Sequence, residues 1–196
     1  MAILAFLSIG TAVDFNPNIL TSGVFRRGDL EGHTAWRNLF YQDGRTSTVS
    51  AHIGTSDGVV VLATNGKPDA TLGPRWIGER VDSVDILPIP QGRDFTTQTL
   101  GPILALAHRP HARTAAVIGH GSGMSATSLL TSERIERLVT IEIEPLMVQG
   151  SLVFLPANGP AFADPRASYV FDDAKSYFAH RRERFDLIRS EEHTSE

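Results

Sequence analysis

Glycines occupy alternate positions in the segment GHGSG at 119–123, between an apolar run at 115–118 and a helix-like segment at 124–130. Because glycine has no side chain, such a loop can turn tightly and bring its backbone close to a ligand. The N-terminus of the following helix favours negative groups. The pattern predicts a nucleotide-type binding loop formed by Gly119, Gly121, Ser122 and Gly123. A glycine turn that only joins a strand to a helix is the alternative.

The spacing of the glycines indicates which kind of ligand the loop binds. The dinucleotide fingerprint has its third glycine three positions after the second, but here that position is Met124. NAD and FAD are therefore disfavoured. A ligand without a pyrophosphate, in which an adenosine and an amino-acid-like tail cross the loop, is favoured. S-adenosylmethionine is a ligand of this kind.

Strand-like and helix-like segments alternate along the second half of the chain. The expected strands are 115–118, 138–143, 169–171 and 185–188, and the expected helices are 95–108, 124–130, 145–155 and 174–179. This alternation with short loops predicts a parallel, doubly wound sheet. Asp94 is expected to cap the first helix. The apolar face of that helix is formed by Leu100, Ile103, Leu104 and Leu106.

The first half of the chain has a different pattern. β-Branched runs at 46–53 and 59–64 are punctuated by Asp57-Gly58 and Asn65-Gly66, which indicates hairpins. We expect a small antiparallel β unit at about 38–80. An irregular, proline-containing connection then completes a domain over 38–93. Two hairpins are only marginally stable alone, so this unit must pack on another element.

In a parallel sheet, ligands bind where the strands end. Glu142 follows the second expected strand and lies nineteen positions beyond Gly123, a separation typical of a carboxylate that accepts hydrogen bonds from ribose hydroxyls. Glu144 precedes Pro145, so its alternative role is that of a helix-entry residue. After the third strand, Asp172 or Asp173 can cap the next helix. The other reading is that one of them caps the helix while Asp173 binds the adenine amino group. In that reading the backbone at Ala174 binds a ring nitrogen of the adenine.

Composition excludes several classes of protein. The net charge of −4 gives no attraction for phosphate polymers, so no nucleic-acid partner is expected. The absence of cysteine excludes disulfides and thiolate metal sites, and cytoplasmic exposure is the default expectation. His108, His111 and His120 straddle both ends of one strand, so no metal site is expected.

The two ends of the chain are interpreted separately from the fold. Residues 1–13 are almost wholly apolar but too few to span a membrane alone, since that needs about 20 residues. We interpret 1–37 as a linker preceded by the stump of a membrane segment, with a buried strand or helix as the alternative. One permitted reverse translation of 189–196 (RSEEHTSE) resembles a sequencing-adapter sequence. That octapeptide is interpreted as a read-through artefact.

The motifs of the chain together resemble those of the spermidine synthases, over about residues 38–188. The resemblance is carried by the β hairpins and by Asn65-Gly66-Lys67, Asp94 to Gln98, the glycine loop, Glu142-Ile143-Glu144 and Asp172-Asp173-Ala174. It is closest to the type fused to membrane segments. In that type a motif similar to Leu20 to Phe25 follows the last membrane-spanning helix. The apolar N-terminal segment would then be the end of such a helix.

The resemblance implies a polyamine aminopropyltransferase. The fold would be α/β, a class I S-adenosylmethionine-dependent methyltransferase-like (Rossmann-like) domain over 94–188, preceded by a β domain used in oligomer contacts. The donor would be decarboxylated S-adenosylmethionine, the acceptor a polyamine such as putrescine, and no metal would take part. A carboxylate would accept the proton of the attacking amine. Gln98 matches a position that lines the family's site.

Two departures from the family pattern affect the predicted site. Ser122 stands where spermidine synthases have an aspartate, so a negative charge near the cationic aminopropyl tail is missing. The family's catalytic aspartate follows the fourth strand, where this chain has Glu191 inside the excluded segment. The catalytic residue is therefore left unassigned. The sheet and active site are expected to be incomplete in a chain truncated at its C-terminus.

Two other functions stay open. One is an S-adenosylmethionine-dependent methyltransferase, for which Ser122 is no obstacle. The other is a non-catalytic domain that binds a nucleoside.

Overall fold

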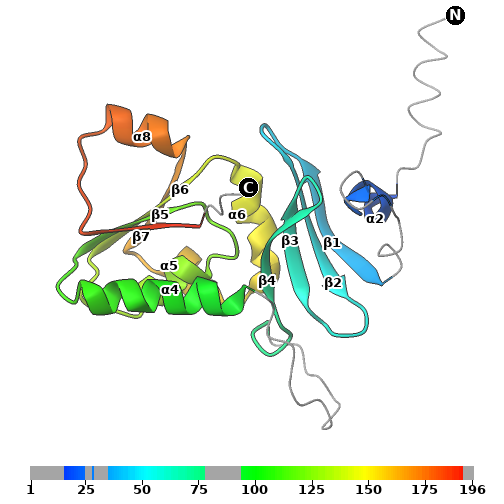
Figure 1. Cartoon of the computed structure of the whole chain (residues 1–196), viewed down its shortest axis with the longest axis horizontal. Coiled ribbons are helices and arrows are strands. Elements are labelled where there is room, and N and C mark those ends of the chain that lie inside the picture. Colours follow the sequence, from blue (N-terminus) through cyan, green and yellow to red (C-terminus); the bar gives the residue numbers. More distant parts are fainter. Residues whose placement is uncertain (1–15, 25–27, 29–34, 78–93, 192–196) are drawn as a thin grey trace, which may run out of the picture.

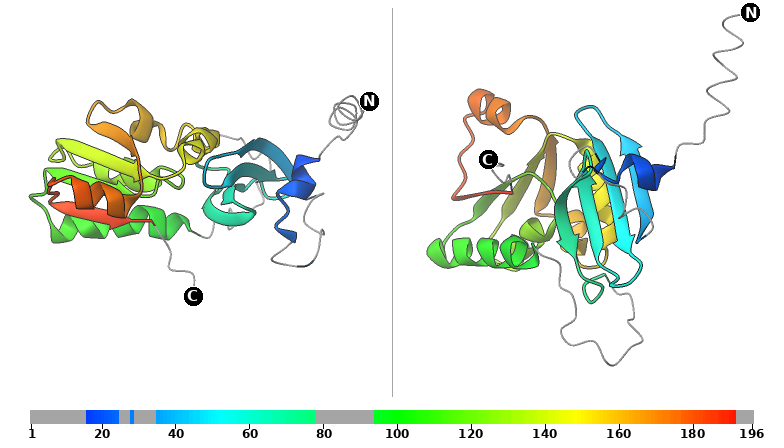
Figure 2. Two further views of the ribbon diagram at one scale, coloured as in Figure 1. Left: turned by 90° about the horizontal axis from the view of Figure 1, so that it is seen from above. Right: turned by 45° about the vertical axis from the view of Figure 1, so that its right-hand side comes forward.

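The computed structural model describes residues 16–24, 28, 35–77 and 94–191. The apolar segment 1–13, the later prolines of the expected connection and residues 192–196 lie outside the described residues. Figure 1 shows two sheets that face each other across α6, and Figure 2 shows the same two units from other sides. No helix among the residues that the structure describes is long and apolar enough to cross a membrane.

The N-terminal unit is a four-stranded antiparallel sheet in the order β1-β2-β3-β4. Its strands are β1 (Trp36–Asp43), β2 (Thr48–Gly54), β3 (Val60–Thr64) and β4 (Lys67–Leu72), and the short helix α2 (Pro17–Leu20) lies beside β1. Asn65 and Gly66 join β3 to β4 with φ angles of 47° and 70°. Both residues tolerate this left-handed region, which the tight hairpin turn requires.

The N-terminal sheet is stabilised by packing against the second unit. Val49 and Leu62 on the sheet share a buried cluster with Met147 and Phe154 from the second unit. A Cβ atom on Gly150 would approach Leu62 to 2.9 Å, so glycine is what allows the helix to lie this close to the sheet. The expectation that the hairpins pack on another element is confirmed.

The C-terminal unit is a parallel sheet in the order β7-β6-β5-β8. Its strands are β5 (Thr114–Ile118), β6 (Arg137–Glu142), β7 (Ala167–Phe171) and β8 (Leu187–Ser190). Its helical segments are α4 (Phe95–His108), α5 (Met124–Leu130), α6 (Pro145–Gly150), the 3₁₀ helix η2 (Ser151–Phe154), α7 (Gly159–Ala163) and α8 (Ala174–His180). The predicted α/β fold, with a small antiparallel sheet before a parallel one, is confirmed.

Two predicted segments differ from the structure. The single helix expected over 145–155 is α6 followed by η2, because glycine at 150 weakens the helix and the Ser151 hydroxyl donates to the carbonyl of Val148. The last strand extends to Ser190, two residues past the predicted boundary, because Ile118 pairs with Ser190. Residues 189 and 190 are thus part of the sheet in this structure.

Helix α4 also differs from its prediction. Asp94 forms no side-chain cap, because its carboxylate lies 3.4 Å from the Thr71 hydroxyl instead. Leu100, Ile103 and Leu104 on its apolar face are each about half exposed. Helix α4 itself lies beside the edge strand β8. The residues that α4 does bury are Gln98 and Pro102.

Candidate functional site

A cavity of about 370 Å³ opens between the two units, at the carboxyl ends of β5 and β6. The C-terminal unit contributes Gln98, Gly119, His120, Gly121, Ser122, Ser125, Glu142, Ile143, Glu144, Met147 and Glu191. The N-terminal unit contributes Thr46, Ser47, Thr64, Lys67, Asp69 and Ala70. The volume is that of an ordinary small-molecule site. Five residues predicted from the sequence, Gln98, Gly119, Gly121, Ser122 and Glu142, meet in this cavity.

The glycine loop has the backbone that its sequence predicts. Gly119, Gly121 and Gly123 have φ angles of 81°, 54° and 81°, a region that side chains disfavour. Gly123 begins α5 behind the cavity wall, where a Cβ atom would lie 2.9 Å from the His120 ring. Each glycine is therefore required by the turn itself. Only Gly119 and Gly121 line the cavity, so only at these two positions would a side chain also hinder the approach of a ligand.

The buried side chain of His120 packs beneath the glycine loop, on Ser151, Phe162 and Tyr169. Its ring is 2% exposed, lies 2.7 Å from the Ser151 hydroxyl through Nε2, and meets Phe162 and Tyr169 edge to face. Burial lowers the pKa of His120 to about 4, so the ring is neutral at pH 7. Asn158 donates to the carbonyl oxygens of Ser122 and Ser151 and completes the support. His120 is thus a packed, uncharged anchor of the loop.

Glu142 lies at the end of β6 and is 6% exposed. Its Oε2 accepts from the backbone N–H of His120 at 2.7 Å, and its Oε1 accepts from that of Glu144 at 2.9 Å. Burial raises the pKa of this carboxyl, and the backbone hydrogen bonds partly oppose that rise. The carboxylate therefore ties the glycine loop to the end of β6 while it lines the cavity. Its predicted contact with a ribose stays a prediction.

Glu144 connects the two units, a role that sequence reasoning missed. It caps α6 through the N–H of Leu146 at 3.2 Å, as its alternative role predicted. Its Oε2 also accepts from the backbone N–H and the hydroxyl of Thr46, at 2.8 Å and 2.7 Å. Burial opposes ionisation, but the hydrogen bonds from Thr46 and Leu146 dominate and lower the pKa of Glu144. Gly44 leaves room for this carboxylate, since a Cβ atom there would lie 2.5 Å from it.

The contact between Thr46 and Glu144 gives a testable prediction for stability. Thr46→Val keeps the shape and the backbone donor but removes the hydroxyl donor to a buried carboxylate. We expect the free energy of unfolding in urea to fall by about 1.5 kcal/mol, the low end for a hydrogen bond to a charged group. Thr97→Val, at an exposed position of α4, is the matched control and should change stability little. Equal stability of the two variants would show that the hydroxyl contributes nothing to the connection.

The wall opposite Glu142 is formed by α4 and the loop. Gln98 is 5% exposed, and its side-chain oxygen accepts from the Ser122 hydroxyl. The Gln98 amide nitrogen is buried and has no hydrogen-bond partner among the described residues. The hydroxyl of Ser125 donates to the carbonyl of Gln98 at 3.1 Å and also contacts Glu191. The described residues therefore leave this buried donor without an acceptor.

The site residues of the N-terminal unit were not predicted. Lys67 and Asp69 lie on β4 and both line the cavity, and Asp69 accepts from the N–H of Thr64 at 3.0 Å. The sequence does contain a signal, since two charged residues stand at alternate positions directly after a hairpin turn. These two residues can be identified as part of a site only when it is known that β4 lies opposite the glycine loop. That arrangement is set by the tertiary structure.

The structure distinguishes the two candidate caps after the third strand. Asp173 is itself the cap of α8, because its backbone is extended and its Oδ1 accepts from the N–H of Ser176 at 2.9 Å. Asp172 accepts from the N–H of Asp173 instead of capping. Neither Asp173 nor Ala174 lines the cavity described above. Their assignment to adenine stays a prediction.

The chain matches the Spermine/spermidine synthase domain over residues 96–194, half of its length. It belongs to this family. A polyamine aminopropyltransferase of Thermococcus onnurineus is 28% identical over 100 residues, which cover 51% of this chain and 35% of that protein. A polyamine aminopropyltransferase of Pseudomonas aeruginosa is 37% identical over 87 residues, covering 44% of this chain and 30% of that protein.

Solved structures of family members share the fold. A spermidine synthase in complex with the transition state analogue AdoDATO superposes with a TM-score of 0.60 at 18% identity, covering 81% of this chain and 47% of that one. Spermidine synthase from Thermotoga maritima superposes equally well, with 79% and 46% covered. This chain thus spans about half the length of these structures and about a third of the curated relatives above.

The two departures from the family pattern both lie in the cavity. The hydroxyl of Ser122 is directed to Gln98, so no carboxylate is present at that position. Glu191 lies directly after β8, where its N–H donates to the carbonyl of Ile118 at 2.8 Å and its carboxylate accepts from Ser125. Among the residues that the structure describes, no group of three or more His, Asp or Glu side chains could hold a metal ion.

Proposed function

We propose that the cavity binds decarboxylated S-adenosylmethionine and that the protein transfers its aminopropyl group to a polyamine such as putrescine. The observation that carries the proposal is the meeting of Gln98, the glycine loop and Glu142 in one cavity, in a chain of the spermine/spermidine synthase family. A solved relative of this fold binds a transition state analogue.

In this proposal each group has a stated role. The amine nitrogen attacks the carbon bonded to the sulfonium, the carbon–sulfur bond breaks, and its electron pair stays on sulfur as methylthioadenosine leaves. The proton of the amine passes to a carboxylate. The loop of Gly119 and Gly121 would hold the nucleoside, Glu142 its ribose, and Asp173 with Ala174 its adenine. Gln98 and Ser122 would face the tail. The catalytic base is left unassigned.

Two measurements test this function. Calorimetry should detect binding of methylthioadenosine, the shared product of all such transfers, and stronger binding of decarboxylated S-adenosylmethionine than of the carboxylated form. Incubation of the complete gene product with that donor and putrescine should yield spermidine and methylthioadenosine. Absence of any adenosine ligand in the complete protein would refute the proposal.

A second candidate is methyl transfer from S-adenosylmethionine. Ser122 favours it, because a carboxylate at this position would select for a cationic aminopropyl tail, and this chain has none there. Stronger binding of S-adenosylmethionine, with S-adenosylhomocysteine as product, would support this candidate. Binding of methylthioadenosine without turnover would instead indicate a nucleoside-binding domain.

Replacing Glu142 tests the ribose contact. Glu142→Ala should weaken methylthioadenosine binding by about 1–3 kcal/mol, because a buried charged acceptor is lost together with two anchors of the loop. Glu136→Ala, at an exposed position of the same unit, should leave the affinity unchanged. Calorimetry on both variants measures the difference. Normal binding by Glu142→Ala would contradict the assignment.

Further proposals concern the whole protein. We propose that it is a cytoplasmic domain attached to a membrane segment in the full-length gene product, that its β domain makes homo-oligomer contacts, and that the polypeptide continues beyond the sheet seen here. The exposed apolar side chains of α4 and the unpaired edge of β8 support the last point, since further elements could cover both. Reading the complete gene tests it. Codons for 189–196 unlike the adapter sequence would refute the read-through interpretation.

A further inference from the structure

The chain before the first sheet touches the hairpin that forms part of the cavity wall. Gly23 is buried, and a Cβ atom on it would lie 2.8 Å from the carbonyl oxygen of Gly66, in the turn between β3 and β4. A Cβ atom on Gly66 would in turn lie 2.8 Å from the Cα atom of Gly23. The two backbones are therefore in direct contact, and glycine at both positions is what permits it.

The segment that makes this contact, residues 16–23, has a defined shape. Both ends of α2 are satisfied locally, since the Asn16 side chain caps its start and the hydroxyls of Thr21 and Ser22 donate to carbonyls of the helix. A helix of four residues is not stable alone. Packing beside β1 and the contact with Gly66 therefore hold it in place.

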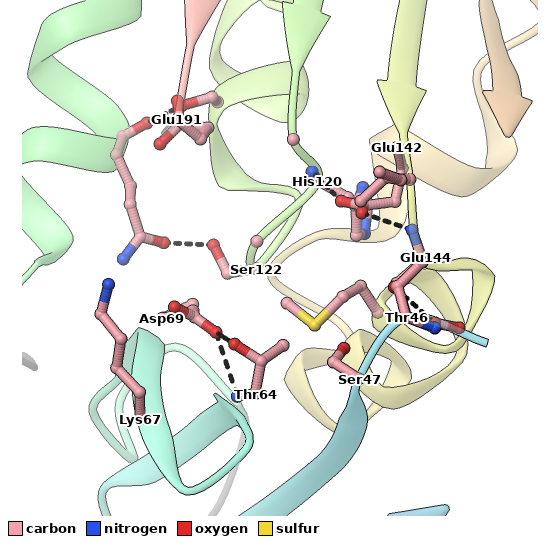
Figure 3. Close-up of a pocket in the computed structure, with 17 residues that line it drawn as sticks. Thr46, Ser47, Thr64, Lys67, Asp69, His120, Ser122, Glu142, Glu144 and Glu191 are labelled. Atoms are coloured by element: carbon pink, nitrogen blue, oxygen red, sulfur yellow. Dashed lines mark hydrogen bonds between the residues drawn. The ribbon is translucent and has the colours of Figure 1, made fainter. Parts of the chain in front are cut away.

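The hairpin turn is continuous with the cavity wall. Thr64 before the turn, and Lys67 and Asp69 after it, all line the cavity, and we call this part of the chain hairpin 64–69. In Figure 3 Lys67 and Asp69 lie on the side of the cavity where Ser122 lies, away from Glu142. A shift of the turn therefore moves the part of the wall that faces the proposed aminopropyl tail and the attacking amine.

Hydrogen bonds connect the same turn to the C-terminal unit. The Asn65 side chain accepts from the N–H of Thr48 at 3.0 Å, and the Asn65 N–H donates to the Thr48 carbonyl at 2.8 Å. Two residues before Thr48, Thr46 donates to Glu144. The turn is thus held between Gly23 on one side and, through Thr48 and Thr46, Glu144 on the other. A displacement at Gly23 would reach the cavity wall through these contacts.

We propose that Gly23 is a positioning residue, whose contact with Gly66 fixes hairpin 64–69 where the cavity holds the amine acceptor. Gly23 itself lies outside the cavity lining and acts through the hairpin. The part that concerns the acceptor rests on the proposed function, whereas the placement of the hairpin does not. The segment before the first sheet thereby contributes to the site without lining it.

Alanine variants at two glycines of similar backbone conformation isolate the contact. Gly23 has a φ of 67° and Gly28 a φ of 76°, so alanine is strained at both positions. Only at Gly23 would the added Cβ atom meet another group, since no atom of the described residues lies within 4 Å of the Cβ position of Gly28. Gly28→Ala is therefore the matched control, and its difference from Gly23→Ala reports on the contact with Gly66.

Hydrogen exchange measures the placement of the hairpin without any ligand. The N–H of Thr64 donates to Asp69 across the hairpin at 3.0 Å. This amide should exchange at least about fivefold faster in Gly23→Ala than in the parent and in Gly28→Ala, because the turn must move away from the added methyl group. Equal exchange in the three proteins would overturn the proposal. If Gly23→Ala does not fold, Thr21→Val loosens the segment without adding an atom at the contact, and unchanged exchange in that variant would overturn the proposal as well.

Turnover by the complete gene product separates positioning from a general loss of stability. In Gly23→Ala, kcat/KM for putrescine should fall about tenfold, because a misplacement of about 1 Å can cost about a hundredfold in rate. The Kd for methylthioadenosine, measured by calorimetry, should stay that of the parent, whereas a purely structural role would impair both. Faster exchange with unchanged kcat/KM would overturn the positioning role. Absence of methylthioadenosine binding in the parent counts against the proposed function instead, and exchange of the Thr64 amide still tests the contact.

Discussion

Gly121→Val should reduce the affinity for methylthioadenosine by more than about a hundredfold, because two independent costs add. Gly121 has a φ of 54°, a conformation in which a β-branched residue is strained. A Cβ atom at this position would lie 4.0 Å from Ala70, in van der Waals contact with β4, so the outer methyl groups of valine would press on β4 and fill the edge of the cavity beside the loop. Calorimetry on the variant measures the loss.

The control for this substitution is Gly159→Val. Gly159 begins α7, has no positive φ, and has no atom within 4 Å of its Cβ position. It should bind methylthioadenosine as the parent protein does. Far-UV circular dichroism on both variants checks that the fold is retained. A folded Gly121→Val protein with unchanged affinity would mean that the ligand does not cross this loop.

The free energy of unfolding should depend on pH through His120. Burial lowers the pKa of this residue to about 4 from its ordinary 6.5. Between these two values the unfolded chain binds a proton that the folded protein excludes. The contribution of His120 is therefore fully present above pH 6.5 and is lost as pH falls towards 4. Its size is about 1.4 kcal/mol for each pH unit, or about 3 kcal/mol in total.

Urea unfolding at several pH values isolates this contribution. His120→Gln removes the titrating ring but keeps a polar side chain next to Ser151, so its unfolding free energy should fall less steeply between pH 6.5 and 4. Carboxyl groups contribute to both proteins and cancel in the comparison. Thr97→Val, at an exposed position of α4, should retain the parent slope. Parallel slopes for parent and His120→Gln would show that His120 is protonated as easily in the folded protein as in the unfolded one.

Local rules sufficed for much of the fold. Asn65-Gly66 predicted a hairpin because few other residue pairs accept its backbone, and the structure places those residues in the turn between β3 and β4. The strand, loop and helix around Gly119 to Gly123 follow from apolar runs and from three positive φ angles. Helix limits were less predictable. The break at Gly150 depends on a weak helix former whose missing side chain also lets the sheet approach.

What the sequence alone determined is the class of fold and the half of the cavity built on the parallel sheet, since loops at strand ends share one edge by topology. Gly119, Gly121, Ser122 and Glu142 were predicted on that basis, and Gln98 was predicted from the resemblance to the spermidine synthases. The other half was decided by tertiary structure. Lys67, Asp69 and Thr46 reach the cavity only because the N-terminal sheet packs on α6, and no local pattern encodes that packing. Contacts between residues 98 positions apart depend on how two apolar surfaces fit together.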